Sequence, residues 1–264
     1  MQKDSVSRTI LVAAVLCIIC SVLVTSSAVV LRDRQEKNKQ LDIKKNLLLA
    51  AGLLKNSYPS EEEIFEAYKS VSSTVIDLDT GEAMPDIDPD SFDQKKMAKN
   101  PKFNKEIPSK KDSAGIKVRS KYSVVYQVKE KGRVSMLMLP VNGKGLWSTL
   151  YGFVALATDT QTIKGIGFYQ HGETPGLGGE IDNVLWKKQW VGKKALDDKF
   201  QVIFKVVKGQ VNPADALAQS QVDGLSGATI TSNGVTGLVQ YWLGGDGFGP
   251  YLSKFRQSYG KIKG

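Results

Sequence analysis

Residues Thr9 to Leu31 carry no charged side chain, and this run constrains the fold of the chain more than any other feature. As a helix its twenty-three residues extend roughly 35 Å at about 1.5 Å per residue, enough to cross a bilayer. A cleaved signal peptide is the alternative, because Lys3 and Arg8 form a basic start and Ser26–Ala28 offers small residues for cleavage. The run is longer than most signal-peptide cores, so we expect a short flank over residues 1–8 and a transmembrane helix over residues 9–31.

The charges that flank this run favour a cytoplasmic position for the rest of the chain. Two basic residues precede the run, and six follow it. The positive-inside rule places the more basic side in the cytoplasm, but it weakens for long domains that cross the membrane as a whole. The six basic residues are Arg32, Arg34, Lys37, Lys39, Lys44 and Lys45.

The composition excludes several classes of function. The net charge of +9 is scattered, without a basic patch interleaved with aromatic residues, so we expect no nucleic-acid partner and some contact with anionic lipid headgroups. His171 is the one histidine, and both cysteines, Cys17 and Cys20, lie in the apolar run. These counts argue against a His/Cys zinc site or a Cys–His nucleophile after the run, and a Gly-x-Ser-x-Gly hydrolase motif is absent. We therefore expect no metal site and no catalytic residue. We interpret the two cysteines as packing residues, and a metal shared with partner subunits is the alternative, because they lie on one helix face.

Patterns along the rest of the chain predict an α+β fold. A capping box that begins at Ser60 indicates a helix, which follows a helical connector over residues 32–58. Alternating apolar residues predict an antiparallel sheet built from two hairpins, 124–128 with 134–139 and 154–157 with 163–169. A helix over 184–190 and a strand over 200–207 follow, and the lysine-rich residues 92–113 form an exposed excursion. The expected architecture is a single N-terminal transmembrane helix followed by one domain, residues 59–264, with an antiparallel sheet and flanking helices.

A glycine-punctuated run of hydroxyl residues, Asp223 to Ser232, precedes the clearest amphipathic helix of the chain. That helix is expected over residues 233–243, and Thr231 or Ser232 would cap it. The first-turn N–H groups and the positive end of the helix dipole would then face any anion beside Thr229. An ordinary N-cap after a turn is the alternative. The apolar stripe of the helix consists of Val235, Leu238, Val239, Trp242 and Leu243.

Two further glycine-rich segments predict loops. One is His171-Gly-Glu-Thr-Pro-Gly-Leu-Gly178, whose bare backbone a flat ring could approach closely, and the other is Gly145-Leu-Trp-Ser-Thr149. A long turn is the alternative for the first loop, and a core position is the alternative for Trp147.

The motif residues resemble a known cofactor site. Asp223-Gly-Leu-Ser-Gly-Ala-Thr229 resembles the signature at which a flavin transferase attaches FMN to threonine through a phosphodiester. Trp242-Leu-Gly-Gly-Asp-Gly-Phe-Gly-Pro250 resembles the C-terminal tail of the C subunit of the sodium-translocating NADH:quinone reductase, and the resemblance covers essentially the whole chain.

The resemblance implies an FMN-binding domain with covalent FMN on Thr229, the last threonine of the signature. Chemistry alone does not exclude the neighbouring hydroxyl of Thr231. The other residues implied in cofactor binding are Asp223, Ser226, Gly227 and Ala228 of the signature, Glu173 and Thr174 as polar contacts, Leu177 as an apolar wall, Gly178, and Trp147 as a stacking partner.

The resemblance further implies a membrane-anchored electron carrier that works only within a sodium-pumping NADH:quinone oxidoreductase and relays electrons from NADH-side centres toward quinone. It implies the bacterial inner membrane with an extracytoplasmic, periplasmic domain, against the flanking charges. The implied partners are other membrane subunits of the complex, the flavin transferase and the lipid bilayer. The alternatives are the G subunit of the related ion-translocating electron-transport complex, which shares the threonine motif, and a membrane-tethered flavin-binding sensor module.

Overall fold

The computed structural model describes residues 5–54, 56 and 58–263, so the first four residues of the expected flank, two residues of the expected connector and Gly264 lie outside the described residues. The chain divides into two compact units, Met1–Ile43 and Lys44–Gly264. Helix α1 (Val6–Ala50) contains the whole expected transmembrane run. It is long and apolar enough to cross a membrane, and its most apolar stretch is exposed throughout.

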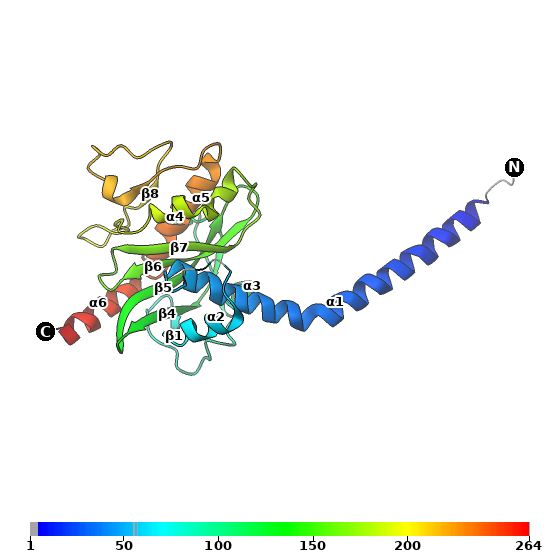
Figure 1. Cartoon of the computed structure of the whole chain (residues 1–264), viewed down its shortest axis with the longest axis horizontal. Helices are drawn as coiled ribbons and strands as arrows, with labels where there is room; N and C mark the ends of the chain where they lie inside the picture. The colour runs from blue at the N-terminus through cyan, green and yellow to red at the C-terminus, as the bar shows by residue number, and fades with distance from the viewer. Residues whose placement is uncertain (1–4, 55, 57, 264) are drawn as a thin grey trace. The chain divides into compact units, whose positions relative to one another are not determined.

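The second unit contains the sheet and all the remaining helices (Figure 1). Its elements after the end of α1 are α2 (Glu61–Tyr68), β1 (Val71–Asp77), α3 (Gln94–Lys99), β2 (Asn104–Glu106), β3 (Val118–Ser120), β4 (Tyr122–Glu130), β5 (Arg133–Lys144), β6 (Thr149–Ala157), β7 (Ile163–Gln170), the 3-10 helix η1 (Gly178–Asp182), α4 (Val184–Lys188), β8 (Lys205–Val206), the 3-10 helix η2 (Ala218–Ser220), β9 (Gln221–Val222), α5 (Thr229–Leu243) and α6 (Gly249–Lys263).

The main sheet is antiparallel, with the strand order β1-β4-β5-β6-β7. Both predicted hairpins are confirmed, and their strands are longer than the sequence indicated. The β4–β5 connection consists of Lys131 and Gly132, whose φ angles of 50° and 78° are both in the left-handed region. A two-residue turn of this kind matches the right-handed twist of the strands that it joins.

The sheet is buried on both faces. Successive residues of a strand point to opposite faces, so the register places Val141, Val154 and Ile166 on one face and Phe153, Gly165 and Gly167 on the other. The first face packs against α5, and all five predicted stripe residues of α5 are buried there or nearby in the main core.

The last turns of α1 pack against the second face. The backbone oxygen of Ala50 lies where a Cβ at Gly165 would be, and the methyl group of Ala50 lies 3.0 Å from the corresponding position at Gly167. Leu47 and Leu48 are fully buried in the same region. The second unit therefore begins at Lys44, fifteen positions before the boundary expected from sequence, because burial of these leucines ties the end of the helix to the domain.

Two local predictions are wrong. The expected strand over 200–207 is reduced to β8, which pairs in parallel with β9, because the Asp197 side chain accepts the N–H groups of Lys199 and Gln201 and holds a turn there. The expected excursion over 92–113 contains α3 and β2, and Asp93 caps α3 by accepting two N–H groups. The capping box at Ser60 is confirmed at the start of α2.

Candidate functional site

Helix α5 begins at Thr229, four residues earlier than the stripe predicted. Ala228 occupies the N-cap position and makes no side-chain cap, so the prediction that Thr231 or Ser232 caps the helix is wrong. Both hydroxyls have other partners. The Ser232 Oγ accepts the N–H of Leu225 at 3.0 Å, and the Thr231 Oγ1 donates to Glu173 at 2.5 Å.

Thr229 is the exposed hydroxyl at this helix terminus, whereas Thr231 is fully buried. Among the described residues, the Thr229 hydroxyl has no hydrogen-bond partner, and the N–H groups of Thr229, Ile230 and Thr231 find no acceptor. The first N–H groups of a helix carry its positive partial charge. The terminus therefore offers unpaired donors and an accessible hydroxyl at one place, which suits a phosphate ester.

Hydrogen bonds of Asp223 stabilise the loop that leads to Thr229. Its Oδ1 accepts the N–H of Val211 at 2.7 Å, and its Oδ2 accepts the amide of Gln189 at 3.1 Å. Its own N–H donates to Gln189, and its carbonyl accepts the indole N–H of Trp186 at 2.8 Å. Both carboxylate oxygens are thus engaged by the chain itself. Ser226 and Gly227 are exposed at the tip of the loop, and Ala228 is buried.

The carboxylate of Glu173 connects three segments that are far apart in the sequence. Its Oε1 accepts the N–H groups of Trp147 at 3.0 Å and Ser148 at 3.3 Å. Its Oε2 accepts the N–H of Leu146 at 3.1 Å and the hydroxyl of Thr231 at 2.5 Å. The β5–β6 loop, the loop after β7 and the first turn of α5 therefore meet at one side chain, which is only 5% exposed.

Burial by itself raises the pKa of Glu173, because it disfavours the charged form. The hydroxyl of Thr231 and the three backbone N–H groups favour the charged form, and together they outweigh burial and lower the pKa below its usual value. Glu173 is consequently an anion at neutral pH. In the described part of the chain no Lys or Arg forms an ion pair with Glu173, so its charge is balanced by the four hydrogen-bond donors together with the nearby His171.

Two glycines make room for this carboxylate. A Cβ at Gly145 would lie 2.6 Å from the Glu173 Oε1, and a Cβ at Gly178 would lie 2.6 Å from the Thr231 Oγ1. A third glycine, Gly227 (φ +68°), lies against Leu177, whose Cδ2 is 2.9 Å from where a Cβ would be. The loop after β7 therefore touches the motif loop as well as the start of α5.

Large apolar side chains on these segments are exposed. Trp147 is 68% exposed, Ile230 58% and Leu177 44%, and Leu146 is also exposed. Trp147 is therefore not a core residue.

Thr174 is exposed, and its carbonyl accepts the N–H groups of Leu177 and Gly179. Sequence reasoning missed Ile230, although its position between two threonines and outside the buried stripe of α5 was a usable signal.

Thr229 also borders a pocket of about 790 Å³. Trp186, Gln189 and the Val207–Gln210 loop line this pocket together with the motif loop, and Lys208 is its one cationic lining residue. Of the predicted residues, this pocket contains only those of the motif loop. Glu173, Leu177 and Trp147 lie outside its lining, so this pocket and the exposed apolar side chains are two separate features of the region around Thr229.

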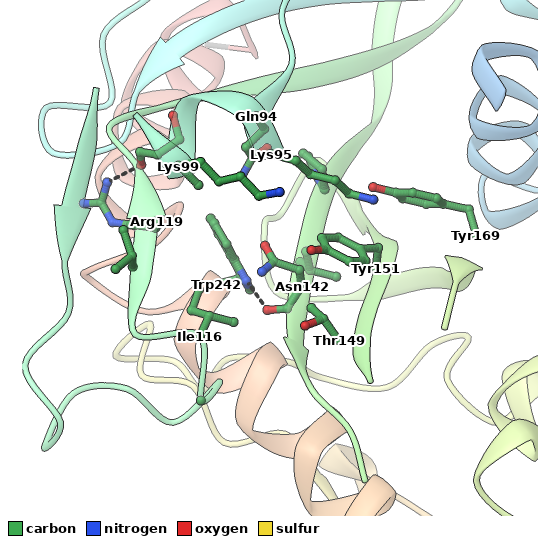
Figure 2. Close-up of a pocket in the computed structure, with 16 residues that line it drawn as sticks. Gln94, Lys95, Lys99, Ile116, Arg119, Asn142, Thr149, Tyr151, Tyr169 and Trp242 are labelled. Atoms are coloured by element: carbon green, nitrogen blue, oxygen red, sulfur yellow. Dashed lines mark hydrogen bonds between the residues drawn. The ribbon is translucent and has the colours of Figure 1, made fainter. Parts of the chain in front are cut away.

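A smaller pocket of about 290 Å³ lies between α3 and strands β5 and β6 (Figure 2). The Lys95 ammonium lies 3.5 Å from the centre of the Tyr151 ring and donates to Gln170, and the Trp242 indole N–H donates to the carbonyl of Asn142. The pocket contains none of the predicted site residues, and we do not connect it with the Thr229 site.

Comparison with known proteins identifies the family of the chain. Residues 145–244 match the FMN-binding domain family. The chain is 45% identical over 256 residues to the C subunit of the Na(+)-translocating NADH-quinone reductase of Pseudomonas aeruginosa, covering 97% of this chain and 98% of the relative. It is also 45% identical to the same protein of Haemophilus ducreyi, covering 98% of each. This chain belongs to the NqrC family, the C subunits of the Na(+)-translocating NADH-quinone reductase.

Solved structures agree with this assignment. The crystal structure of Shewanella oneidensis NqrC superposes with a TM-score of 0.76 at 36% identity and covers 84% of this chain and 99% of that one. The crystal structure of the family member from Parabacteroides distasonis has a TM-score of 0.65 at 26% identity. The segment that matches the FMN-binding domain family contains Glu173, Trp147 and Thr229, so the convergence described above lies within it.

His171 supports the loop that carries Glu173. Its Nε2 lies 2.8 Å from Asp182, and its Nδ1 accepts the N–H of Glu173 at 3.2 Å. The hydrogen bond to Asp182 raises the pKa of His171 above its usual value, although partial burial opposes the shift.

We predict that Asp182→Asn lowers the pKa of His171. Because the folded-state pKa is raised, the ion pair stabilises the domain fully below the unfolded value, 6.5, and this contribution is lost as the pH rises through the folded-state pKa. The single histidine gives one unambiguous imidazole signal, so a ¹³C-histidine NMR titration of the detergent-solubilised chain measures the shift. Equal pKa values in the two proteins would contradict the prediction.

Proposed function

We propose that this chain carries FMN bound covalently to Thr229 through a phosphodiester and relays electrons in a Na(+)-translocating NADH-quinone reductase. Family membership and the FMN-binding domain make it an FMN electron-carrier subunit of that complex, with the other subunits as partners. These matches favour the NqrC family over the G subunit of the related complex and over a sensor module. The covalent bond and its site are our inference.

The choice of Thr229 rests on the contrast between the two motif threonines. Thr229 is exposed, has an unpartnered hydroxyl and stands at the first residue of a fifteen-residue helix. Thr231 is fully buried, and its hydroxyl is held by Glu173. A flavin transferase needs access to the acceptor oxygen, so the buried hydroxyl is a poor substrate. The free N–H groups of the first turn would then bind the phosphodiester.

The exposed apolar side chains suit the isoalloxazine ring. Trp147, Leu177 and Ile230 lie on the segments that converge beside Thr229, and a flat aromatic ring is their natural partner. When bound, FMN supplies the one- and two-electron redox chemistry. The chain binds its phosphate, orients the ring and shields one face from water.

A covalent attachment also has a physical purpose in a domain outside the cytoplasm. We propose that the second unit is extracytoplasmic, where a lost flavin could not be recovered from the cytosol, and that α1 anchors the chain in the bilayer with basic residues near anionic headgroups. Attachment through the phosphate leaves the isoalloxazine electronically unchanged. The main effect of the covalent bond would therefore be to retain the flavin, and not to change its reduction potential.

Thr229→Val is expected to abolish covalent FMN, because valine is nearly isosteric but lacks the acceptor hydroxyl. Thr231→Ser keeps the hydroxyl that Glu173 binds, and Thr231→Val removes it, yet both should retain most of the flavin. Intact-mass spectrometry of the purified chain, expressed together with a flavin transferase, reads the adduct directly. An unchanged adduct on the Thr229 variant would refute the assignment.

Replacing Trp147 by Leu is expected to leave FMN attached but to shift its reduction potentials, because stacking and solvent access change while the phosphodiester is untouched. Trp147→Phe keeps an aromatic face and should give a smaller shift. Spectroscopic redox titration measures both variants. Potentials and flavin spectra identical to wild type in the Leu variant would show that the indole does not contact the ring.

The domain is expected outside the cytoplasm despite the six basic residues after the apolar run, since long domains cross largely regardless of local charge. Fusing either an alkaline phosphatase or a green fluorescent protein after Gly264 distinguishes the two sides. The phosphatase fusion should be active and the fluorescent fusion dark. The opposite pattern would place the domain in the cytoplasm.

A further inference from the structure

We propose that Glu173 is a positioning residue that locks the three segments of the flavin site together before the flavin binds, rather than a polar group that contacts the ring. Its relevance to FMN rests on the proposed function, but the lock itself is a property of the chain. We call the four hydrogen bonds from Leu146, Trp147, Ser148 and Thr231 to its carboxylate the Glu173 clasp.

The geometry leaves Glu173 little capacity for a ligand. Each carboxylate oxygen already accepts two hydrogen bonds, and the side chain is almost fully buried. Three of the four donors are consecutive backbone N–H groups, a nest that binds one anion tightly. An incoming flavin would have to displace these charge-assisted bonds, each stronger than a neutral hydrogen bond.

The Glu173 clasp holds the backbone of residues whose side chains are not fixed by packing in the core. Trp147 is mostly exposed, so core packing does not hold its ring, and the hydrogen bond from its N–H to Glu173 fixes its backbone instead. Thr231 stands two residues after Thr229, so the same carboxylate fixes the first turn of α5. Relative orientation of the stacking surface and the attachment point thus depends on one side chain.

The surroundings are fitted to a charged carboxylate at this position. Gly145 and Gly178 leave space that any side chain would fill, and a Cβ at either would lie 2.6 Å from an oxygen of the clasp. His171 accepts the N–H of Glu173 and is itself held by Asp182, so the backbone beneath the clasp is also fixed. The space left by the two glycines and the fixed backbone of Glu173 therefore both favour the carboxylate in this position.

The test compares amide hydrogen exchange in residues 145–148 between the wild-type chain and variants, in detergent. Glu173→Gln places an NH₂ group against N–H donors, so exchange there should become about ten- to a hundredfold faster, the loss expected for charge-assisted bonds. Glu180→Gln is the matched control. Glu180 lies in η1, seven positions after Glu173, and in the described part of the chain its carboxylate accepts a hydrogen bond only from the Asn183 side chain, so its variant should exchange at the wild-type rate.

Thr229→Val separates the clasp from the flavin. If the clasp forms before the cofactor binds, this flavin-free variant keeps wild-type protection of residues 145–148. Loss of protection in Thr229→Val, or unchanged exchange in Glu173→Gln, would overturn the proposal. This arm does not require that flavin be attached to the wild-type chain, so its outcome is independent of the proposed function.

The reduction potential of the flavin shows whether Glu173 positions the flavin or only stabilises the fold. Glu173→Gln removes a fixed negative charge and loosens the site, so any attached flavin should titrate at a more positive potential. Thr231→Val keeps the charge and removes one bond of the clasp, so it should change the potential less, and Thr231→Ser should restore wild-type behaviour. If Glu173→Gln leaves the potential unchanged while exchange accelerates, the clasp does not act on the flavin and the positioning role is wrong.

The two Thr231 variants keep the proposal testable if Glu173→Gln fails to fold. Thr231→Val removes one donor of the clasp, whereas Thr231→Ser keeps it, so exchange at residues 145–148 should be faster in the valine variant. Equal exchange in the two variants would refute the clasp.

Discussion

The arrangement around Thr229 depends on one buried anion and the donors that surround it. A buried carboxylate without partners costs several kcal/mol, so Glu173 is tolerated only where N–H and O–H groups replace its water. Those donors come from positions 25 to 58 residues away in the sequence. Any movement of the β5–β6 loop or of the first turn of α5 would leave the charge unsatisfied, which makes the three segments cooperative.

The rest of the domain provides a rigid base for this junction. Helix α5 packs against one face of the sheet through a stripe of buried side chains, and its N-terminus is thereby held at the level of the β5–β6 loop. The end of α1 covers the other face, where Gly165 and Gly167 let its backbone approach the strand. Because close-packed side chains resist displacement, burial of both faces holds the sheet against α5 and the end of α1.

The exposed position of Thr229, the residue proposed to carry the flavin, suits a relay better than an enzyme with an enclosed substrate cavity. An electron carrier must present its cofactor to the other subunits of its complex, and Thr229, Trp147, Ile230 and Leu177 are all accessible at the surface. A covalent tether and a pre-formed site together would compensate for this openness, since neither the retention nor the orientation of the flavin would then depend on burial.

The sequence by itself determined the features that short-range patterns control. The apolar run within α1, both hairpins, the capping box at Ser60 and the buried stripe of α5 follow from periodicity and local hydrogen bonding. The threonine motif and the tail also pointed to the family.

Tertiary structure alone decided where α5 begins, because Thr231 bonds to Glu173 instead of capping the helix. It likewise reduced the strand expected over 200–207 and gave Glu173 its partners. In each case a side chain can form a hydrogen bond either with a local backbone group or with a group that the fold brings near. The sequence does not specify where the distant group lies, so it cannot predict which hydrogen bond forms.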